Sequence, residues 1–530
     1  MMGIAPFSLK PDYWVHFEVL NEDLEFLYNH LLEIETPLVP EDLVKVLVEE
    51  RIRKEKSALS SQQSAAGTIY LPKGNFQVGQ NLIFPGRNWE KGEVVNLRSG
   101  VNPELSSFDV IDVVFENSEK RSFAASLQNH ILNQPIQINL DDPQLDIKKV
   151  LAHHGDHITA RLTEELESNP DLVRIAGKWF PRALLVDINM GHLNLVEAVL
   201  EVSGGGPLPT RDLMEQIDLP KDVNSKLNEF SLNLALQEDE RFDEVGPEGK
   251  ILWYLHRLEP EPVQQPPFNL RYSPIVHDEI AVKPLVSQFE GQMADELEAF
   301  SSIQIVNHEI SLALLYPHLR AGTIPLCGQI GQLFPTAYES PRVQFTFVDG
   351  ENGAKFSGWV VRPYKYVYGL REWYLKNELM PGSVITIKKS TNPGEVIIHS
   401  NRKRPVKDWV RTAMIGSDGG IVFALLKHSL STTLDERMAI VISDNQALDQ
   451  IWEQGNKSRA PLAHTIKTMM RELAKLSPQG HIHAQELYAA INVIRRCPPG
   501  PILSILIESP WAVHLGDLYF RLDESIEEER

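Results

Sequence analysis

The sequence predicts a multi-domain α+β protein in which small helical units accompany two β-rich modules. Three observations support this prediction. An aromatic-containing hairpin pattern recurs at the end of three helical segments, at 170–185, 241–258 and 510–523. Short β-like runs separated by turns fill residues 68–125 and recur beyond about residue 303. A chain of 530 residues also has room for roughly three to five domains, each with a core of its own.

Composition is that of an ordinary globular protein. Hydrophobic residues make up 42% of the chain and charged residues 23%. The chain contains no run of about 18 apolar residues, so we expect no membrane span, and its start lacks the pattern of a secretory signal. The two cysteines, Cys327 and Cys497, are isolated, which excludes a disulfide framework. A cytoplasmic location is the expectation that follows.

The net charge of −21 conceals a local excess of positive charge. Residues 355–411 contain 12 Lys or Arg residues against 4 Asp or Glu residues, a local balance of +8, and the remainder of the chain carries −29. A strongly acidic protein repels nucleic acid on average, but binding depends on the local potential. Residues 355–411 are therefore where we expect nucleic acid to bind.

The first 130 residues predict a helical region followed by a small barrel. Residues 1–66 show helical periodicity broken at "ETPLVPEDL", where Pro40 suits a first helical turn, and a winged-helix-like arrangement is one interpretation. Residues 67–130 hold five short β-like runs with glycine-containing turns, which predict a small β-barrel. This barrel is similar in length and layout to Tudor or KOW-like modules.

Three helical segments end in the recurring hairpin: 145–190, 191–260 and the last part of 431–530. In 191–260 a helix is stopped by "SGGGPLPT", Thr210 can cap a second helix, and a third helix precedes the hairpin. Three helices and a two-stranded hairpin form a winged helix-turn-helix. We therefore expect three such units from internal duplication, with hairpin aromatics covering each core. The aromatic residues expected to be buried in this way are Trp179, Phe180, Trp253, Tyr519 and Phe520.

Two further boundaries follow from composition. The Pro-rich string "LEPEPVQQPPFNLRYSP" predicts a linker over 261–302. Residues 303–430 are predicted to form a larger β-rich domain that carries the basic stretch. A helical region over 431–530 then closes on the last winged unit.

The unit at 192–258 resembles the HARE-type winged helix, a domain found in the delta subunit of bacterial RNA polymerase and in some chromatin-linked and restriction proteins. The resemblance implies a non-catalytic, transcription-associated module, with DNA, RNA polymerase or other protein subunits as partners. It covers under one seventh of the chain. The matching features are the helix before "GGGPLPT" and the residues Leu213, Met214, Asn233, Leu236, Asp239, Arg241, Phe242, Val245, Gly246, Gly249 and Trp253.

The resemblance leaves open whether this unit touches DNA. A recognition helix normally offers Lys, Arg, Asn or Gln to phosphates and base edges. Here the third helix presents Lys226 beside Glu229, Glu238, Asp239 and Glu240. We interpret this unit as a protein-binding or spacer module, with phosphate contact as the alternative.

The basic stretch interleaves cations with aromatic residues, as nucleic-acid binding requires. Cations supply affinity through counterion release, and aromatic rings stack on unpaired bases. The alternative is that the aromatic residues form a β core and the charges a solvated face. The string "GLREWYLKNELMPGSVITI" is also faintly similar to DNA-binding pseudobarrels in plant transcription factors and restriction enzymes, where a short helix precedes a "PG" turn and a strand. The residues predicted to bind nucleic acid are Arg362, Lys365, Tyr366, Arg371, Lys388, Lys389, Arg402, Lys403, Arg404, Lys407 and Arg411.

Other chemistry finds little support in the sequence. The histidines of "HHGDH" lack the accompanying ligands of a metal site, and "SGGGP" lacks the Gly-Lys-Ser/Thr of a phosphate loop. No nuclease or hydrolase signature stands out. We therefore predict a protein without catalytic residues, metal or cofactor.

These observations together predict a non-enzymatic, DNA-associated protein that acts in transcription or its regulation. The alternative is a protein-interaction scaffold, or a subunit of a larger polymerase or defence assembly, without direct nucleic-acid contact. A restriction-type nuclease is the third interpretation.

Overall fold

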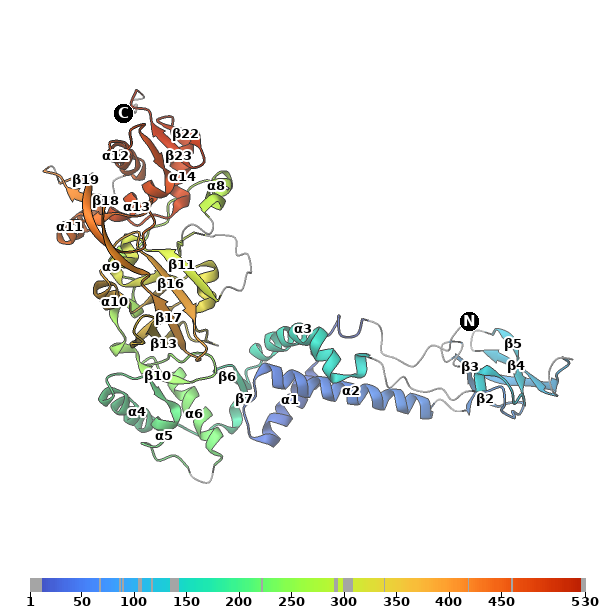
Figure 1. Cartoon of the computed structure of the whole chain (residues 1–530). Coiled ribbons are helices and arrows are strands. Elements are labelled where there is room, and N and C mark those ends of the chain that lie inside the picture. The colour runs from blue at the N-terminus through green and yellow to red at the C-terminus, as the bar shows by residue number, and fades with distance from the viewer. Residues whose placement is uncertain are drawn as a thin grey trace. The chain divides into compact units, whose positions relative to one another are not determined.

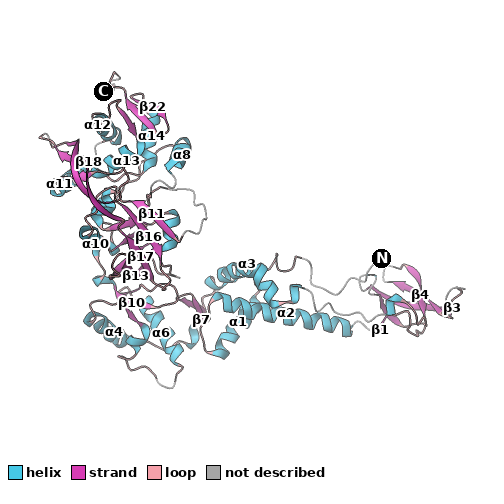
Figure 2. Cartoon of the chain, in the orientation of Figure 1, coloured by secondary structure: helices cyan, strands magenta, loops and turns pink. Residues whose placement is uncertain are grey.

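The computed structural model describes residues 12–65, 68–84, 87, 90–102, 107–115, 118–133, 143–220, 223–289, 294–298, 308–337, 339–417, 419–458 and 461–525. Over these ranges the protein is a mixture of helices and several β-sheets, which confirms the predicted α+β class (Figures 1 and 2). It separates into two compact units, one formed by 1–186 with 224–227 and the other by 187–223 with 228–530.

The helical part of the first unit is assembled from two separate segments of the chain. Its elements are α1 (Asn21–Ile34), α2 (Pro40–Ala65), α3 (Ile147–Glu167), β6 (Leu172–Ile175) and β7 (Lys178–Pro181). Helix α2 packs against α3, and α1 against β7. Leu38, between α1 and α2, forms an antiparallel bridge with Trp179 of β7, and the Trp179 amide donates to the Leu38 carbonyl at 2.8 Å. The range 145–190 thus holds one long α-helix, a 3-10 turn at Arg182–Leu184 and the hairpin, and not the three helices expected there.

A five-stranded sheet lies in sequence between α2 and α3. Its strands are β1 (Thr68–Ile69), β2 (Asn81–Phe84), β3 (Glu90–Ser99), β4 (Asp109–Phe115) and β5 (Lys120–Ala125), paired in chain order. The amides of Ser126 and Leu127 donate to the carbonyls of Gly74 and Pro72 at 3.0 and 2.8 Å, which ties the end of the sheet back to its start. Contacting aromatic rings fill the core: Tyr70, Phe84, Phe115 and Phe123.

The second unit begins with three helices and a three-stranded sheet. The elements are α4 (Met190–Val202), β8 (Leu208–Pro209), α5 (Thr210–Met214), α6 (Ser225–Gln237), β9 (Phe242–Glu244) and β10 (Leu252–Leu255), with strand order β8-β10-β9. Trp253 lies in the core and is 1% exposed. Its indole N–H donates to Asn233 Oδ1 at 2.9 Å and to Thr210 Oγ1 at 3.2 Å, which satisfies the buried donor.

A curled seven-stranded sheet follows. Its elements are β11 (Glu309–Ala313), α9 (Tyr316–Ala321), β12 (Thr323–Pro325), β13 (Arg342–Asp349), β14 (Lys355–Val361), β15 (Tyr366–Tyr368), α10 (Arg371–Lys376), β16 (Val384–Lys389) and β17 (Glu395–His399). The strand order is β11-β16-β17-β13-β14-β15-β12. As the sequence predicts, α10 precedes the Pro381–Gly382 turn and β16.

The segment expected to be a linker is packed against both neighbouring cores. It forms α7 (Glu261–Gln264) and α8 (Glu279–Val286), with short 3-10 turns at Phe268–Leu270 and Ser287–Phe289. Val263 is buried beside Trp359 and Tyr366 of the seven-stranded sheet. Val282 and Phe289 belong to the core of the C-terminal helices.

The C-terminal region starts with a long two-stranded ribbon of β18 (Arg402–Ile415) and β19 (Ile421–Thr432), with β20 (Val441–Ile442) beside β18. Helices α11 (Asn445–Ser458), α12 (Leu462–Ala474), α13 (Ala484–Ile494) and α14 (Pro499–Glu508) follow, together with a sheet of β21 (His481–His483), β23 (Tyr519–Leu522) and β22 (Ala512–Gly516) in that order. The ribbon crosses the expected domain boundary at 430, because β19 continues to Thr432.

Three parts of the chain share one order of elements. In each, a helix is followed by a short extended segment, two more helices and a hairpin, and the extended segment pairs antiparallel with the last hairpin strand. These pairings are Leu38 with Trp179, β8 with β10, and β21 with β23. The hairpin aromatics Trp179, Phe180, Trp253 and Phe520 are buried as predicted, but Tyr519 is 36% exposed.

The hairpin of the second helical part packs against the seven-stranded sheet. Val245 and Tyr254 share a buried cluster with Trp359 and Tyr366. The Gln344 amide donates to the Val245 carbonyl at 2.8 Å, so the contact includes a backbone hydrogen bond. This hairpin is consequently covered within the same chain.

None of the helices in the described ranges combines the length and the apolar character that crossing a membrane requires.

Candidate nucleic-acid interface

The β18–β19 ribbon is anchored at both ends and free in its middle. At one end the Val384 amide donates to the Thr433 carbonyl at 2.8 Å, which joins the ribbon to the seven-stranded sheet. At the other end Ala413, Ile421 and Phe423 are buried in the core of the C-terminal helices. Between these anchors, residues 402–409 are all exposed, as are 425–427 on the paired strand. We call residues 402–409 and 425–432 the arch.

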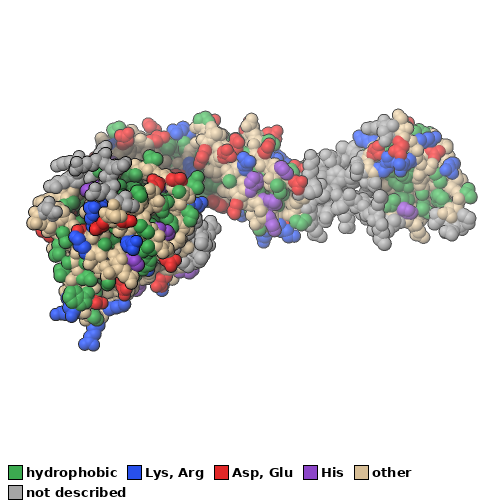
Figure 3. All heavy atoms as spheres, turned by 90° about the horizontal axis from the view of Figure 1, so that it is seen from above, with side chains coloured by type: hydrophobic (Ala, Val, Ile, Leu, Met, Phe, Trp, Pro, Cys, Tyr) green, Lys and Arg blue, Asp and Glu red, His purple; other side chains and the backbone are tan. Residues whose placement is uncertain are grey.

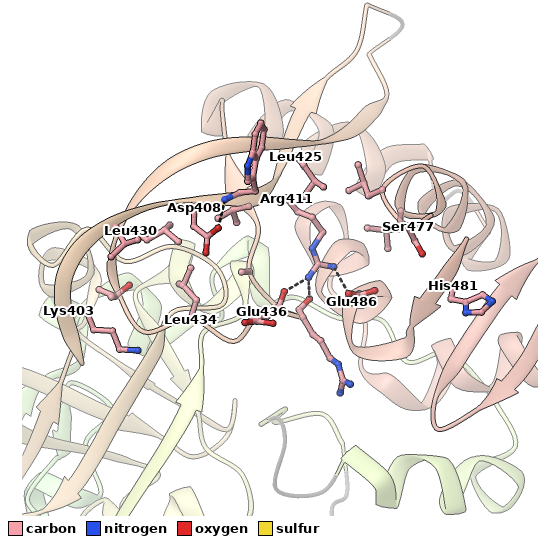
Figure 4. A pocket seen from close by; sticks show the side chains of 18 of the residues that line it. Lys403, Asp408, Arg411, Leu425, Leu430, Leu434, Glu436, Ser477, His481 and Glu486 are labelled. Carbon is pink, nitrogen blue, oxygen red and sulfur yellow. Dashed lines mark hydrogen bonds and ion pairs between the residues drawn. The ribbon is translucent and has the colours of Figure 1, made fainter. Parts of the chain in front are cut away.

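A groove of about 1040 Å³ lies between the arch and the C-terminal helical region (Figure 4). One wall is the arch itself. The opposite side is formed by the loop Leu434–Ala439, the end of α12 and its following turn, His481 of β21, and Tyr519 of β23. The groove thus draws on segments up to about a hundred residues apart in the sequence, all within the second compact unit.

Charges of both signs line the groove, with free cations on the arch. Lys403 and Arg404 are exposed and line it, and Arg437 stands on the loop. Asp408, Glu436 and Glu486 supply the acidic groups. Acidic and basic side chains are likewise interspersed over the face drawn in Figure 3. Positive charge in the groove therefore lies mainly on the arch, with Arg437 on the opposite wall.

Arg411 is a structural residue of the groove. Its side chain is 10% exposed, and its guanidinium donates to the carbonyls of Glu436 and Arg437, both at 2.5 Å. It also forms an ion pair with Glu486 at 3.4 Å, and these interactions appear in Figure 4. Burial lowers its pKa, against the opposing effect of Glu486. Arg411 therefore holds the loop to the ribbon and has little of its guanidinium left for a phosphate.

Two aromatic rings in the groove are exposed, and each has a cation nearby. Trp409 of β18 is 60% exposed, and the Lys427 Nζ lies 5.7 Å from its ring centroid. Tyr519 is 36% exposed, and the Arg437 guanidinium lies 6.0 Å from its ring. Such pairs offer a stacking face next to a positive charge.

The structure distributes the predicted binding residues over several places. Lys403, Arg404 and Arg411 line the groove, and Arg402 and Lys407 lie on the arch. The Arg402 guanidinium donates to the Lys376 carbonyl at 3.1 Å.

The remaining predicted residues belong to the region of the seven-stranded sheet: Tyr366, Lys388 and Lys389 on its strands, Arg362 and Lys365 between β14 and β15, and Arg371 in α10. Tyr366 is 1% exposed and its hydroxyl donates to the Pro262 carbonyl, so it belongs to the core. Arg362 donates to the Pro335 carbonyl at 3.0 Å, and Lys388 pairs with Glu309 at 3.8 Å. Lys365, Arg371 and Lys389 are exposed. The interpretation of the aromatic residues as a β core is confirmed for four of them, which are all buried: Trp359, Tyr366, Trp373 and Tyr374.

Three residues at this site escaped the sequence-based prediction: Arg437 and Tyr519, which line the groove, and Lys427, which lies on the arch beside Trp409. Lys427 faces Trp409 across the ribbon, a pairing that only the register of β18 with β19 reveals. Alternation would not have found Lys427, because it shares a strand face with the buried Ile421 and Phe423. Tyr519 was expected in a hydrophobic core, and its exposure depends on a packing that the hairpin pattern does not specify.

A cluster of ionisable groups lies where the second hairpin meets the seven-stranded sheet. Asp243, His256 and Glu259 are close enough to hold a cation, but Arg342 Nη1 already lies among them, 2.5 Å from Asp243 Oδ2 and 3.4 Å from both His256 Nδ1 and Glu259 Oε2. The guanidinium occupies the place of an ion, so the cluster cross-links the hairpin to the sheet. Burial and the neighbouring Asp243 raise the pKa of Glu259 to about 8.

No protein-family model, curated protein or solved structure matches this chain. The functional interpretation depends on the residues and their arrangement.

Proposed function

We propose that this is a non-enzymatic DNA-associated protein, acting in transcription or its regulation, that binds DNA at the arch and the adjoining groove. The observation that carries the proposal is the set of exposed cations on a ribbon held at both ends. Lys403, Arg404, Lys407 and Lys427 are exposed, and none forms an ion pair with a carboxylate of the described residues. Cations that are not engaged by carboxylates of the protein are available to neutralise phosphates.

The helical parts fit the same proposal as winged-helix units. Their shared order of elements supports the assignment, as does the HARE-type resemblance at 192–258. The second of them has an acidic third helix and a hairpin packed on the seven-stranded sheet. We therefore assign that unit to protein contacts and leave DNA contact to the arch.

A specific observation favours the second candidate, a protein-interaction scaffold or assembly subunit. Val406, Leu425 and Leu426 on the arch are 61%, 43% and 39% exposed. Apolar side chains of this size on one protruding ribbon are typical of protein-binding surfaces. The test of the proposal must therefore separate charge from apolar contact.

The test is a salt titration of DNA binding by the full-length protein, followed by fluorescence anisotropy. Replacing Lys403, Arg404, Lys407 and Lys427 with Ala is expected to lower the magnitude of the slope of log K against log salt by about 3, since each phosphate contact contributes about 0.7–0.9. The control variant removes the same number of cations outside the groove: Lys365, Arg371, Lys388 and Lys389.

The control variant is expected to keep the slope of the wild type. Equal losses in both variants would assign binding to diffuse charge. Absence of binding by the wild-type protein would favour the scaffold.

A further inference from the structure

We infer that the groove beneath the arch binds an unpaired DNA strand, with Trp409 and Tyr519 as stacking platforms for its bases. This inference rests on the proposed DNA binding and specifies its substrate class. It follows from three properties of the groove: its size, the anchoring of the arch and the placement of the two rings.

The size of the groove suits a few nucleotides. Its volume of about 1040 Å³ lies just above the range for small-ligand sites, about 300–1,000 Å³. A DNA duplex, whose major groove alone is about 12 Å wide, is too large to lie inside it. An unpaired strand presents one sugar-phosphate chain and a row of flat bases, which a groove of this size can accommodate.

The anchoring of the arch argues against the usual duplex-reading use of a β-ribbon. A two-stranded ribbon reads the major groove when it can enter it. Here the hairpin end, residues 412–424, contains no Lys or Arg, and Ala413, Ile421 and Phe423 are buried in the C-terminal core. The cations lie between the two anchors of the ribbon, and Lys403 and Arg404 line the groove.

Trp409 has the surroundings of a stacking residue on the arch. It faces Lys427 directly across the ribbon, and the Lys427 Nζ lies 5.7 Å from its ring. With 60% of the residue exposed, a large part of the indole can receive a base while Lys427 meets the adjoining phosphate.

Tyr519 is held in place on the other side of the groove. Its ring packs edge-on against His483, with centroids 4.9 Å apart and planes at 74°. His483 also caps α13 by accepting from the Gln485 amide at 3.2 Å, so its position is fixed by the helix. Arg437 adds a cation 6.0 Å from the Tyr519 ring. The two platforms therefore have the same composition, an exposed ring with a neighbouring cation.

The experiment compares a labelled oligo-dT strand with a hairpin duplex of equal nucleotide count, using the full-length protein at one salt concentration. The wild type is expected to bind the unpaired strand more tightly. W409L and Y519L, which keep apolar bulk without a π face, are each expected to weaken oligo-dT binding by about tenfold, because stacking contributes about 1–3 kcal/mol per base. W409F and Y519F are expected to stay close to the wild type.

Y364L is the matched control, because Tyr364 is also 36% exposed but does not line the groove. Equal thermal melting of all variants checks that they fold. Tighter binding of the duplex by the wild type, or unchanged oligo-dT binding by W409L and Y519L, would overturn the inference while leaving DNA binding itself in place. If the wild type binds neither probe, the proposed function fails first and the inference fails with it.

Discussion

Trp253 is the residue on which the core of the second helical part depends. It is 1% exposed, and its indole N–H donates hydrogen bonds to both Asn233 Oδ1 and Thr210 Oγ1. Trp253→Ala is expected to lower the free energy of unfolding by about 3–5 kcal/mol, because it leaves a cavity and removes the donor from two buried acceptors. Chemical denaturation monitored by far-UV circular dichroism measures the change.

Trp409→Ala is the matched control, since Trp409 is 60% exposed. Surface substitutions of this kind usually change stability by about 0.5 kcal/mol or less. Equal midpoints for the wild type and both variants would contradict the packing described for Trp253.

Glu259 makes stability depend on pH. Its side chain is fully buried, and Asp243, His256, Arg342 and Tyr254 are the titratable groups around it. Burial raises its pKa to about 8, from about 4.3 in an unfolded chain. Between these pH values the carboxyl of Glu259 keeps its proton in the folded protein but has lost it in the unfolded chain. The free energy of unfolding therefore falls as pH rises through this window, and the whole decrease is present above about pH 8.

Glu259→Gln removes this titration, so stability is expected to fall less between about pH 5 and pH 8.5 than in the wild type. Urea midpoints at the two pH values measure the difference, with the exposed Glu372→Gln as control. Part of the pH dependence of stability should remain in Glu259→Gln, because burial also raises the pKa of Glu244, to about 7. Identical pH profiles for wild type and variant would mean that Glu259 is ionised in the folded protein and paired with Arg342.

At the scale of elements, Arg411 determines how the ribbon is held to the loop Leu434–Ala439. Arg411→Ala leaves the carbonyls of Glu436 and Arg437 and the Glu486 carboxylate without this partner. We expect a loss of about 1–3 kcal/mol in stability, with no change in the salt slope of DNA binding.

Arg404→Ala is the comparison, because Arg404 is exposed on the same strand. It is expected to lower the magnitude of the salt slope by about 0.7–0.9 and to leave stability nearly unchanged. A slope change in Arg411→Ala as large as that in Arg404→Ala would assign a phosphate contact to Arg411.

Sequence patterns predict elements better than they predict the pairing between elements. Helical periodicity and the "GGGPLPT" stop locate α4 to α6 and their hairpin correctly. The partners of the hairpin at β6 and β7 were not predicted, because Leu38 meets Trp179 across more than a hundred residues. Local periodicity carries no information on such a distant contact.

The candidate site was likewise predictable only in part from the sequence. The cations of the arch are visible in the sequence as "NRKRPVK". The sequence does not show that Tyr366 is separate from these cations, because alternation in a strand shows which residues share a face but not which face is covered. Arg437 and Tyr519 reach the groove only through the packing of the C-terminal helices against the ribbon.

At the scale of the whole molecule, the order of the modules follows from the sequence, whereas their limits depend on packing. The Pro-rich stretch was predicted to be a linker, yet Val263 and Phe289 are buried in the two cores beside it. Proline content predicts the extended backbone of such a segment. It does not predict whether neighbouring domains cover that backbone.

The placement of the five-stranded sheet between α2 and α3 has a consequence for synthesis of the protein on the ribosome. Helices α1 and α2 are made first, but their apolar partners in α3 and the β6–β7 hairpin end only at Pro181. At about 5–20 residues per second, roughly 6–23 s pass between the synthesis of Ala65 and of Pro181. During that time α1 and α2 lack the partners they pack against in the folded protein, so we expect ribosome-associated chaperones to bind the nascent N-terminal helices.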